Sequence, residues 1–229
     1  NDEIVSAEPG SEILGEGEGN YTDLKNDIIN NGGSLTKSIY RYCDGDGGTI
    51  EITTPNMVIN GNGAVIDMNG STIRAFTVYA SGVTIKNLTI KNANYNRNGG
   101  AIYFDSTGTV TNCNFVDNKA TGDFSYGGAV YFLNNGNVTN CNFTDNSATV
   151  NGGAVWMYSG TVSNCNFTDN SAYYGGAVYL LNTGNVSNCN FTNNTASGDG
   201  GAVYFWDQGT VTNCNFTNNT ATSQGGAIR

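Results

Sequence analysis

Short runs of alternating hydrophobic and polar residues recur along this chain, separated by turns rich in glycine and asparagine. Between residues 83 and 92, Val83, Ile85, Leu88 and Ile90 alternate with polar residues, and Asn87 breaks the alternation by one position. A period of two residues is typical of a β-strand with one buried face. Asparagine tolerates the left-handed backbone conformation, so Asn87 predicts a corner between two short strands.

Two motifs repeat at a nearly constant spacing through the second half of the chain. Gly-Gly-Ala starts at Gly99, Gly127, Gly152, Gly175, Gly200 and Gly225, so successive copies are separated by 28, 25, 23, 25 and 25 positions. Cys-x-Phe starts at Cys113, Cys141, Cys165, Cys189 and Cys214, with separations of 28, 24, 24 and 25 positions. A fixed period in the range of about 20–50 residues indicates an array in which each unit packs on its neighbours.

Each unit contains three short strands and cannot bury a core alone, which predicts an all-β fold, a parallel β-helix. Coils of this length with asparagine corners favour the right-handed form. We expect about seven coils of three strands, from about Thr49 to about Asn219, with a period of about 24–25 positions. The β-helix is assigned to residues 49–229, and we expect it to be truncated at its C-terminal end, because the chain stops partway into a coil.

Stacking of the units places equivalent residues in columns. We expect three inward columns. One is of valine, in Val110, Val138, Val162, Val186 and Val211, and one is of reduced, buried cysteine, from Cys113 to Cys214. The third is of phenylalanine, in Phe115, Phe143, Phe167, Phe191 and Phe216. We expect the corner residues to form a hydrogen-bonded asparagine ladder, in Asn112, Asn140, Asn164, Asn188 and Asn213. An aromatic column is expected to point outward, in Tyr103, Tyr131, Trp156, Tyr179 and Tyr204.

Positions 1–48 lack the repeat. Residues 1–20 carry six acidic and no basic residues, which predicts a flexible acidic lead-in. Tyr21 to Asn30 has the spacing of an amphipathic helix, with Thr22 as its N-cap and Leu24 and Ile28 on its apolar face. We expect this helix to belong to an N-terminal cap, residues 21–48, that covers the apolar end of the array.

The composition of the chain argues against nucleic acids, membranes and metal ions as partners. The formal net charge is −10, histidine is absent, and after Lys119 the only basic residue is Arg229. Such a surface cannot hold a phosphate backbone, so we expect no nucleic-acid partner. No stretch approaches the roughly 18 apolar residues of a membrane-spanning helix, so no direct membrane insertion is expected for this fragment. No cysteine or histidine pair has metal-ligand spacing, so no metal or cofactor is expected.

Two groups of acidic residues are candidates for catalysis. Asp117, Asp145 and Asp169 fall in one column, but that column continues as Asn193 and Asn218, which favours a turn position. A weak calcium site and a hydrolase carboxylate pair remain the alternatives for this column. Near the N-terminus, the acids that could converge with Arg41 or Arg74 are Asp44, Asp46, Glu51 and Asp67.

The motif pair Gly152-Gly153-Ala154-Val155 and Phe167-Thr168-Asp169-Asn170 resembles the repeat of chlamydial polymorphic membrane proteins. The chain resembles adhesin-like surface proteins of methanogenic archaea more closely, through a helix like Tyr21–Asn30 and segments like Val58–Gly63 and Val83–Ile90. The resemblance covers residues from about 21 to 229. It implies a right-handed β-helix, secretion, an extracellular location at the cell surface, and attachment to host or neighbouring cells.

The expected function is a non-catalytic, adhesin-like protein that presents a repetitive polar and aromatic face to glycans or cells. Outward tyrosine and tryptophan rings can stack on sugars, which makes the aromatic column the candidate binding site. The same column could instead stabilise the sheet by stacking between coils. Two further functions stay open: a polysaccharide lyase or glycoside hydrolase on this fold, and a structural stalk.

Overall fold

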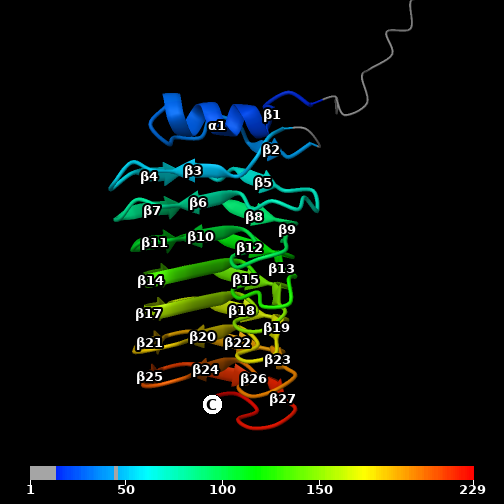
Figure 1. Ribbon diagram of the computed structural model, residues 1–229, viewed down its shortest axis with the longest axis vertical. Coiled ribbons are helices and arrows are strands. Elements are labelled where there is room, and N and C mark those ends of the chain that lie inside the picture. The colour runs from blue at the N-terminus through cyan, green and yellow to red at the C-terminus, as the bar shows by residue number, and fades with distance from the viewer. Residues whose placement is uncertain (1–13, 44–45) are drawn as a thin grey trace, which may run out of the picture.

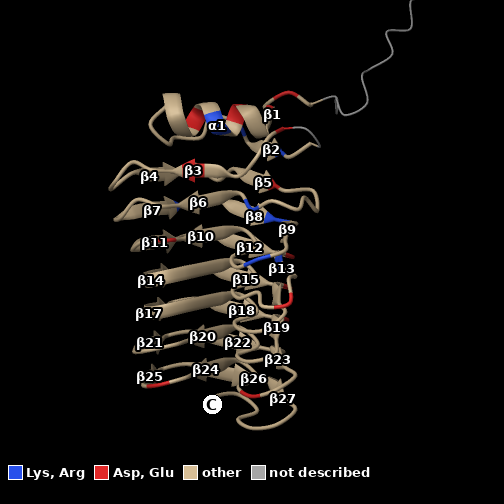
Figure 2. Ribbon diagram, in the orientation of Figure 1, with Lys and Arg blue, Asp and Glu red and all other residues tan. Residues whose placement is uncertain are grey.

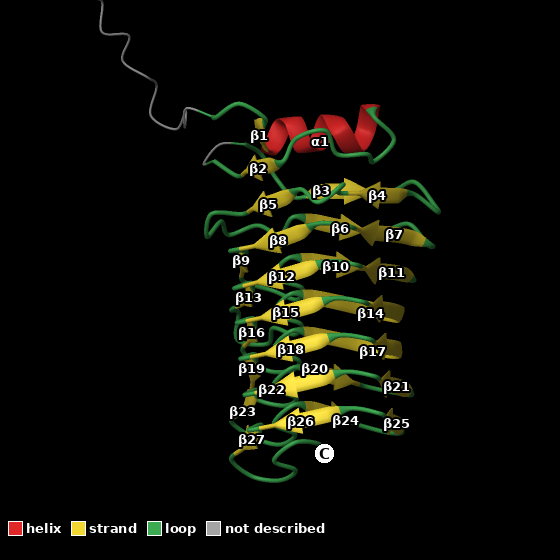
Figure 3. Cartoon of the chain, turned by 180° about the vertical axis from the view of Figure 1, so that it is seen from behind, coloured by secondary structure: helices red, strands yellow, loops and turns green. Residues whose placement is uncertain are grey.

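The computed structural model describes residues 14–43 and 46–229. The chain winds into a stack of coils, and one helix lies across the N-terminal end of the stack (Figure 1). Strands from successive coils pair in parallel and in register, forming sheets of twelve, nine and six strands. Seen from behind, the same coils stack along one axis, with loops at their sides (Figure 3). The architecture is a parallel β-helix.

The strands are short, and equivalent strands recur once per coil. The twelve-stranded sheet contains β3 (Ile50–Ile52), β4 (Val58–Asn60), β6 (Phe76–Val78), β7 (Val83–Lys86), β10 (Ile102–Phe104), β11 (Gly108–Thr111), β14 (Val130–Thr139), β17 (Val155–Ser163), β20 (Val178–Leu180), β21 (Gly184–Ser187), β24 (Val203–Phe205) and β25 (Gly209–Thr212). The nine-stranded sheet contains β1 (Glu18–Asn20), β2 (Ile39–Arg41), β5 (Val65–Asp67), β8 (Thr89–Lys91), β12 (Asn114–Val116), β15 (Asn142–Thr144), β18 (Asn166–Thr168), β22 (Asn190–Thr192) and β26 (Asn215–Thr217). The six-stranded sheet contains β9 (Asn94–Tyr95), β13 (Lys119–Ala120), β16 (Ser147–Ala148), β19 (Ser171–Ala172), β23 (Thr195–Ala196) and β27 (Thr220–Ala221).

The described residues contain the seven predicted coils, from β3 to β27, together with partial turns that bring the solenoid to about eight. The three predicted strands per coil are present, but the prediction missed a fourth, very short strand in six of the coils. In two coils the first and second strands merge into one, β14 or β17. The fourth strand was missed because it is too short to show a period of two.

The core is built from the predicted inward columns. The valines and cysteines up to Val186 and Cys189 are buried, and those of the last coil are less covered. The rings of Phe115, Phe143, Phe167, Phe191 and Phe216 stack with centroids 4.8–5.0 Å apart. Fully burying one such side chain contributes about 1.5–3 kcal/mol. The stack therefore supplies a large part of the stability of each coil.

Two columns of asparagine or aspartate have left-handed backbone, in addition to the first glycine of each Gly-Gly-Ala motif. The predicted corner residues Asn87, Asn112, Asn140, Asn164, Asn188 and Asn213 all have φ between 52° and 57°. The mixed column Asp117, Asp145, Asp169, Asn193 and Asn218 has φ between 53° and 57°. Aspartate and asparagine are the non-glycine residues that adopt this conformation most readily. The column of aspartates is therefore a second corner, as the exchange with asparagine predicted.

The prediction of the ladder at the first corner is wrong in position. The buried ladder follows the second corner, in Asn118, Asn146, Asn170, Asn194 and Asn219. The Nδ2 atom of Asn146 donates to the Oδ1 atom of Asn170 at 3.0 Å and to the Phe115 carbonyl at 3.0 Å. A second, exposed ladder runs through Asn114, Asn142, Asn166, Asn190 and Asn215. Repeated asparagine marks every one of these columns, and they differ in backbone conformation and in side-chain direction, which the sequence does not show.

The N-terminal end is closed by α1 (Tyr21–Asn30), which lies across the first coils (Figure 1). Its apolar face, with Leu24 and Ile28, is buried as predicted. The N-cap is Asn20 and not Thr22: the Asn20 Oδ1 atom accepts from the backbone amide of Asp23 at 2.9 Å. The predicted flexible lead-in is wrong for Glu18–Asn20, which forms β1 and pairs with β2. Residues 1–13 of that lead-in lie outside the described residues.

Lysine and arginine gather in the N-terminal half of the stack, and the charged residues of the later coils are mostly scattered aspartates (Figure 2). Asp67 is the centre of one cluster: its carboxylate lies 3.0 Å from Lys91 Nζ and 3.5 Å from Arg41 Nη1. Burial by itself raises the pKa of Asp67, but hydrogen bonds from Asn92 and Lys91 outweigh it and hold the pKa below its usual value. This cluster ties β2 to the first coils.

Within the described residues, no helix has the length and hydrophobicity that crossing a membrane requires.

We predict that Asn170→Ala lowers the free energy of unfolding by about 2–4 kcal/mol, because it leaves two donors of Asn146 without their acceptor inside the core. Asn166→Ala is the matched control on the exposed ladder, with an expected loss of about 0.5–1 kcal/mol. Urea unfolding followed by far-UV circular dichroism measures both. Equal losses for the two variants would contradict a special role of the buried ladder.

We predict that acid loosens the N-terminal end. The folded-state pKa of Asp67 lies below its ordinary value of 3.8, so its contribution to stability is complete above about pH 4. That contribution is lost as the pH falls through the lower folded-state pKa. Hydrogen exchange of β2 and β5 should therefore accelerate below about pH 4. In Asp67→Asn the exchange of these strands should already be faster at pH 7, and unchanged exchange there would count against the ion cluster.

Candidate functional site

The predicted outward aromatic column exists as a continuous stack beside β10, β14, β17, β20 and β24. Strand register aligns Tyr103, Tyr131, Trp156, Tyr179 and Tyr204 in successive coils. The centroid distances between neighbouring rings are 5.1, 4.4, 6.2 and 5.1 Å, and the ring planes are within 10° of parallel. These side chains belong to a cluster separate from the main core, so the predicted outward direction is correct.

The expectation that this column forms an exposed face is wrong for its three middle rings. Tyr131, Trp156 and Tyr179 are only 3–6% exposed. The rings of Tyr126 and Tyr174, from loops beside the column, pack over them. Burial accordingly raises the pKa of Tyr179 to about 12. Tyr103 and Tyr204, at the two ends of the column, are partly exposed. That any of the five binds a ligand stays a prediction.

The acidic candidates for catalysis do not gather in one cluster: Glu51 lines a groove with Arg74, and the other candidates lie elsewhere. Each aspartate of the corner column lies in the turn of a different coil, and the Oδ1 atom of Asp117 pairs with Lys119 Nζ at 3.0 Å. Asp46 accepts a hydrogen bond from the Cys43 amide, and Asp67 pairs with Arg41 and Lys91. Asp44 lies outside the described residues. In the part of the chain that the structure describes, no three histidine, cysteine, aspartate or glutamate side chains gather closely enough to hold a metal ion.

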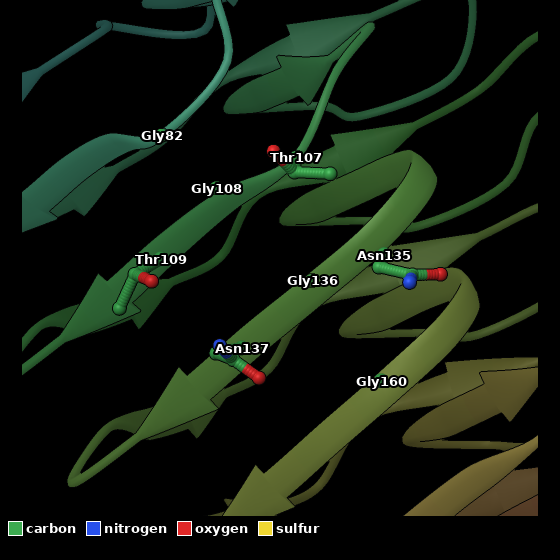
Figure 4. Close-up of a pocket in the computed structure, with 8 residues that line it drawn as sticks. All are labelled: Gly82, Thr107, Gly108, Thr109, Asn135, Gly136, Asn137 and Gly160. Carbon is green, nitrogen blue, oxygen red and sulfur yellow. The ribbon is translucent and has the colours of Figure 1, made fainter. Parts of the chain in front are cut away.

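One groove of about 410 Å³ crosses the coils at the junction of the first and second strands (Figure 4). Its lining is glycine, threonine and asparagine: Gly82, Thr107, Gly108, Thr109, Asn135, Gly136, Asn137 and Gly160. A Cβ atom on Gly136 would lie 2.5 Å from Phe132 Cγ, and one on Gly160 only 1.9 Å from the Gly136 carbonyl oxygen. Glycine is needed here because the backbone passes closely over the core, and the missing side chains leave the groove. Its lining contains no titratable side chain.

A second groove, of about 470 Å³, lies at the N-terminal end of the aromatic column. We call it the Arg74 groove; it is lined by Thr49, Glu51, Arg74, Thr77, Tyr79, Tyr95, Arg97, Asn98, Tyr103 and Asp105. Register places Glu51 and Thr77 at the position that aromatic residues occupy in the later coils. These two side chains lack the rings that would fill the space, so the column stops at Tyr103 and leaves a hollow.

Tyrosine rings surround the one cation buried in this groove. Arg74 is 7% exposed, and its guanidinium carbon lies 4.3 Å from the ring centroid of Tyr95 and 4.7 Å from that of Tyr103. Such cation–π contacts attract the guanidinium group to the rings. The Tyr103 hydroxyl donates to Asp105 Oδ1 at 3.3 Å. Burial, and then the Asp105 carboxylate, raise the pKa of Tyr103.

The comparison with protein-family models found a match to the right-handed β-helix region over residues 26–228. The chain belongs to the right-handed β-helix family. This match confirms the predicted right-handed parallel β-helix. The searches of curated proteins and of solved structures found no match. Membership of this family is compatible with adhesin, lyase and hydrolase roles, so function has to be argued from the site.

The sequence carries a signal for the Arg74 groove that the prediction did not use. Hydrogen bonds between Ala75 and Ala101 and between Ala101 and Ala129 align residue 74 with the second glycine of the Gly-Gly-Ala motif. In this right-handed β-helix the later coils hold glycine there, and at Gly100 a Cβ atom would lie 2.1 Å from the next coil's carbonyl oxygen. The arginine at this position shows which coil departs from the repeat, since the later coils have glycine there. The prediction named Arg74 and Glu51, which do line one groove, but it did not include the tyrosines that lie beside them.

We predict that Trp156→Ala destabilises the fold by about 3–5 kcal/mol, because Trp156 is buried between Tyr131 and Tyr179. Trp206 is 65% exposed and serves as the matched control, since Trp206→Ala should cost less than about 1 kcal/mol. Urea unfolding measures both losses. Tryptophan fluorescence adds a check: the emission of Trp206→Ala, which comes from Trp156 alone, should lie at shorter wavelength than that of Trp156→Ala. The reverse order would contradict the burial of Trp156.

Proposed function

We propose that this right-handed β-helix is a non-catalytic, secreted, adhesin-like protein of the cell surface that binds glycans on host or neighbouring cells. The observation that carries the proposal is the Arg74 groove. In it, the exposed ring of Tyr79 and the partly exposed rings of Tyr95 and Tyr103 lie beside Glu51, Arg97, Asn98 and Asp105. Aromatic faces with hydrogen-bonding groups at their edges match the apolar faces and hydroxyl rims of sugar rings.

The position of the groove supports a binding role better than the buried column does. The middle of the column is covered by loops, so its rings contribute stacking to the fold. At the groove the same outward column becomes accessible through Tyr103. The proposal therefore moves the binding site from the whole column to its N-terminal end.

One observation favours an enzyme as the second candidate. Two carboxylates, those of Glu51 and Asp105, line the Arg74 groove, and a glycoside hydrolase uses a carboxylate pair. A structural stalk is the third function left open. The non-catalytic proposal rests on two acidic groups already having partners: Asp67 is held by two cations, and Asp105 accepts a hydrogen bond from Tyr103 inside the groove.

We predict that the folded protein binds oligosaccharides without releasing products and that Tyr79→Ala weakens this binding at least tenfold. A glycan array followed by titration calorimetry measures binding, and a reducing-end assay on the bound polysaccharides measures turnover. Tyr158→Ala is the matched control, because Tyr158 is 42% exposed, close to the 48% of Tyr79, but lies away from the groove.

The outcomes separate the three functions. Binding that is lost in Tyr79→Ala and kept in Tyr158→Ala supports the adhesin. Product release that is lost in a double variant of Glu51 and Asp105 would replace it with the enzyme. Absence of both binding and turnover would leave the stalk.

A further inference from the structure

The guanidinium of Arg74 is a buried charge with no carboxylate partner in the described part of the chain. The ion pairs found there use Arg41, Lys91, Lys119 and Arg229. Arg74 itself is held by aromatic rings, although it is only 7% exposed. Buried charges in proteins are ordinarily paired or bound to a ligand. This one lines an open groove, where a ligand can reach it.

The guanidinium of Arg74 has five N–H donors, more than its described contacts with tyrosine side chains use. Its guanidinium carbon lies over the rings of Tyr95 and Tyr103, and one side-chain hydrogen bond joins it to Tyr95. The N–H donors of a guanidinium lie in one plane, in a fork that matches the two oxygens of a carboxylate. Burial lowers the pKa of Arg74 from its ordinary value, and the neighbouring tyrosines oppose this shift.

We propose that the Arg74 groove binds an acidic sugar, whose carboxylate is held by the Arg74 guanidinium while its ring stacks on Tyr79. This inference rests on the proposed function, and it names the class of glycan that the site takes. The carboxylate and the guanidinium form the charge-assisted pair that the groove lacks. Tyr103, whose ring supports Arg74, becomes a positioning residue for that pair.

The charges around the groove select a ligand with isolated carboxylates. Glu51 and Asp105 balance Arg74 and Arg97 among the lining residues, and the whole chain carries a formal charge of −10. A densely charged polyanion would be repelled by this surface. A sugar residue with one carboxylate places that charge at Arg74 and offers hydroxyl groups to the two acidic side chains. The same arrangement disfavours a nucleic acid or a polyphosphate.

The test uses an array of matched oligosaccharide pairs, in which the acidic member carries a carboxylate where the neutral member has a hydroxymethyl group. A tetramer of β-1,4-linked glucose and the same tetramer with one glucose replaced by glucuronic acid are one such pair. For the intact chain we expect the preferred acidic glycan to bind at least tenfold more tightly than its neutral partner, as a charged hydrogen-bonded pair provides. Arg74→Met should abolish this preference, and Arg74→Lys should keep part of it because the charge remains.

Arg97→Met is the matched control, since Arg97 lines the same groove on its exposed side and should change the preference less than threefold. Circular dichroism verifies that each variant is folded. If Arg74→Met does not fold, the comparison of acidic and neutral glycans on the intact chain still decides. Equal binding of both members would overturn this inference and leave glycan binding standing. Absence of binding to every glycan would overturn the inference and the proposed function together.

Discussion

The fold depends on one constraint: a buried asparagine must find its hydrogen-bond partners in the coils before and after it. Each amide between Asn118 and Asn194 lies in the core, and each Nδ2 atom donates both to the next asparagine and to a carbonyl of an earlier coil. A slip of one position would leave these groups unpaired inside an apolar core, at a cost of about 1–3 kcal/mol for each group. The ladder therefore keeps valine on valine, cysteine on cysteine and phenylalanine on phenylalanine.

Because the later coils obey this constraint, they resemble one another and offer few places for specific chemistry. Their outward rings stack and are covered by loops, and their glycine groove has no titratable lining. Specificity enters where the repeat is interrupted. In the first coils the outward position holds Glu51 and Thr77 in place of a ring, and an arginine stands where later coils have glycine. The hollow formed there gathers tyrosines, acids and the guanidinium of Arg74.

The columns of the β-helix were predictable to different degrees. The inward valines, cysteines and phenylalanines were correct, because strand alternation and the regular spacing of the motifs together leave one arrangement that buries them all. Both corners were also correct, since asparagine and aspartate are the side chains that fit them best. The ladder was predicted in the column of Asn112, but the structure has it in the column of Asn118. A column of asparagines looks the same in sequence whether its side chains point into the core or its backbone forms the corner.

The sequence by itself determined the array, its period, its core and its corners, since these follow from local patterns repeated in every unit. It also determined the outward direction of Tyr131, Trp156 and Tyr179. Only the tertiary structure decided that these rings are covered, because Tyr126 and Tyr174 precede Gly-Gly-Ala at a position whose residue type varies and whose side-chain direction the sequence does not show. It alone decided that Arg74 meets Tyr95 and Tyr103, since that contact joins parts of the chain that are distant in sequence through the stacking of coils.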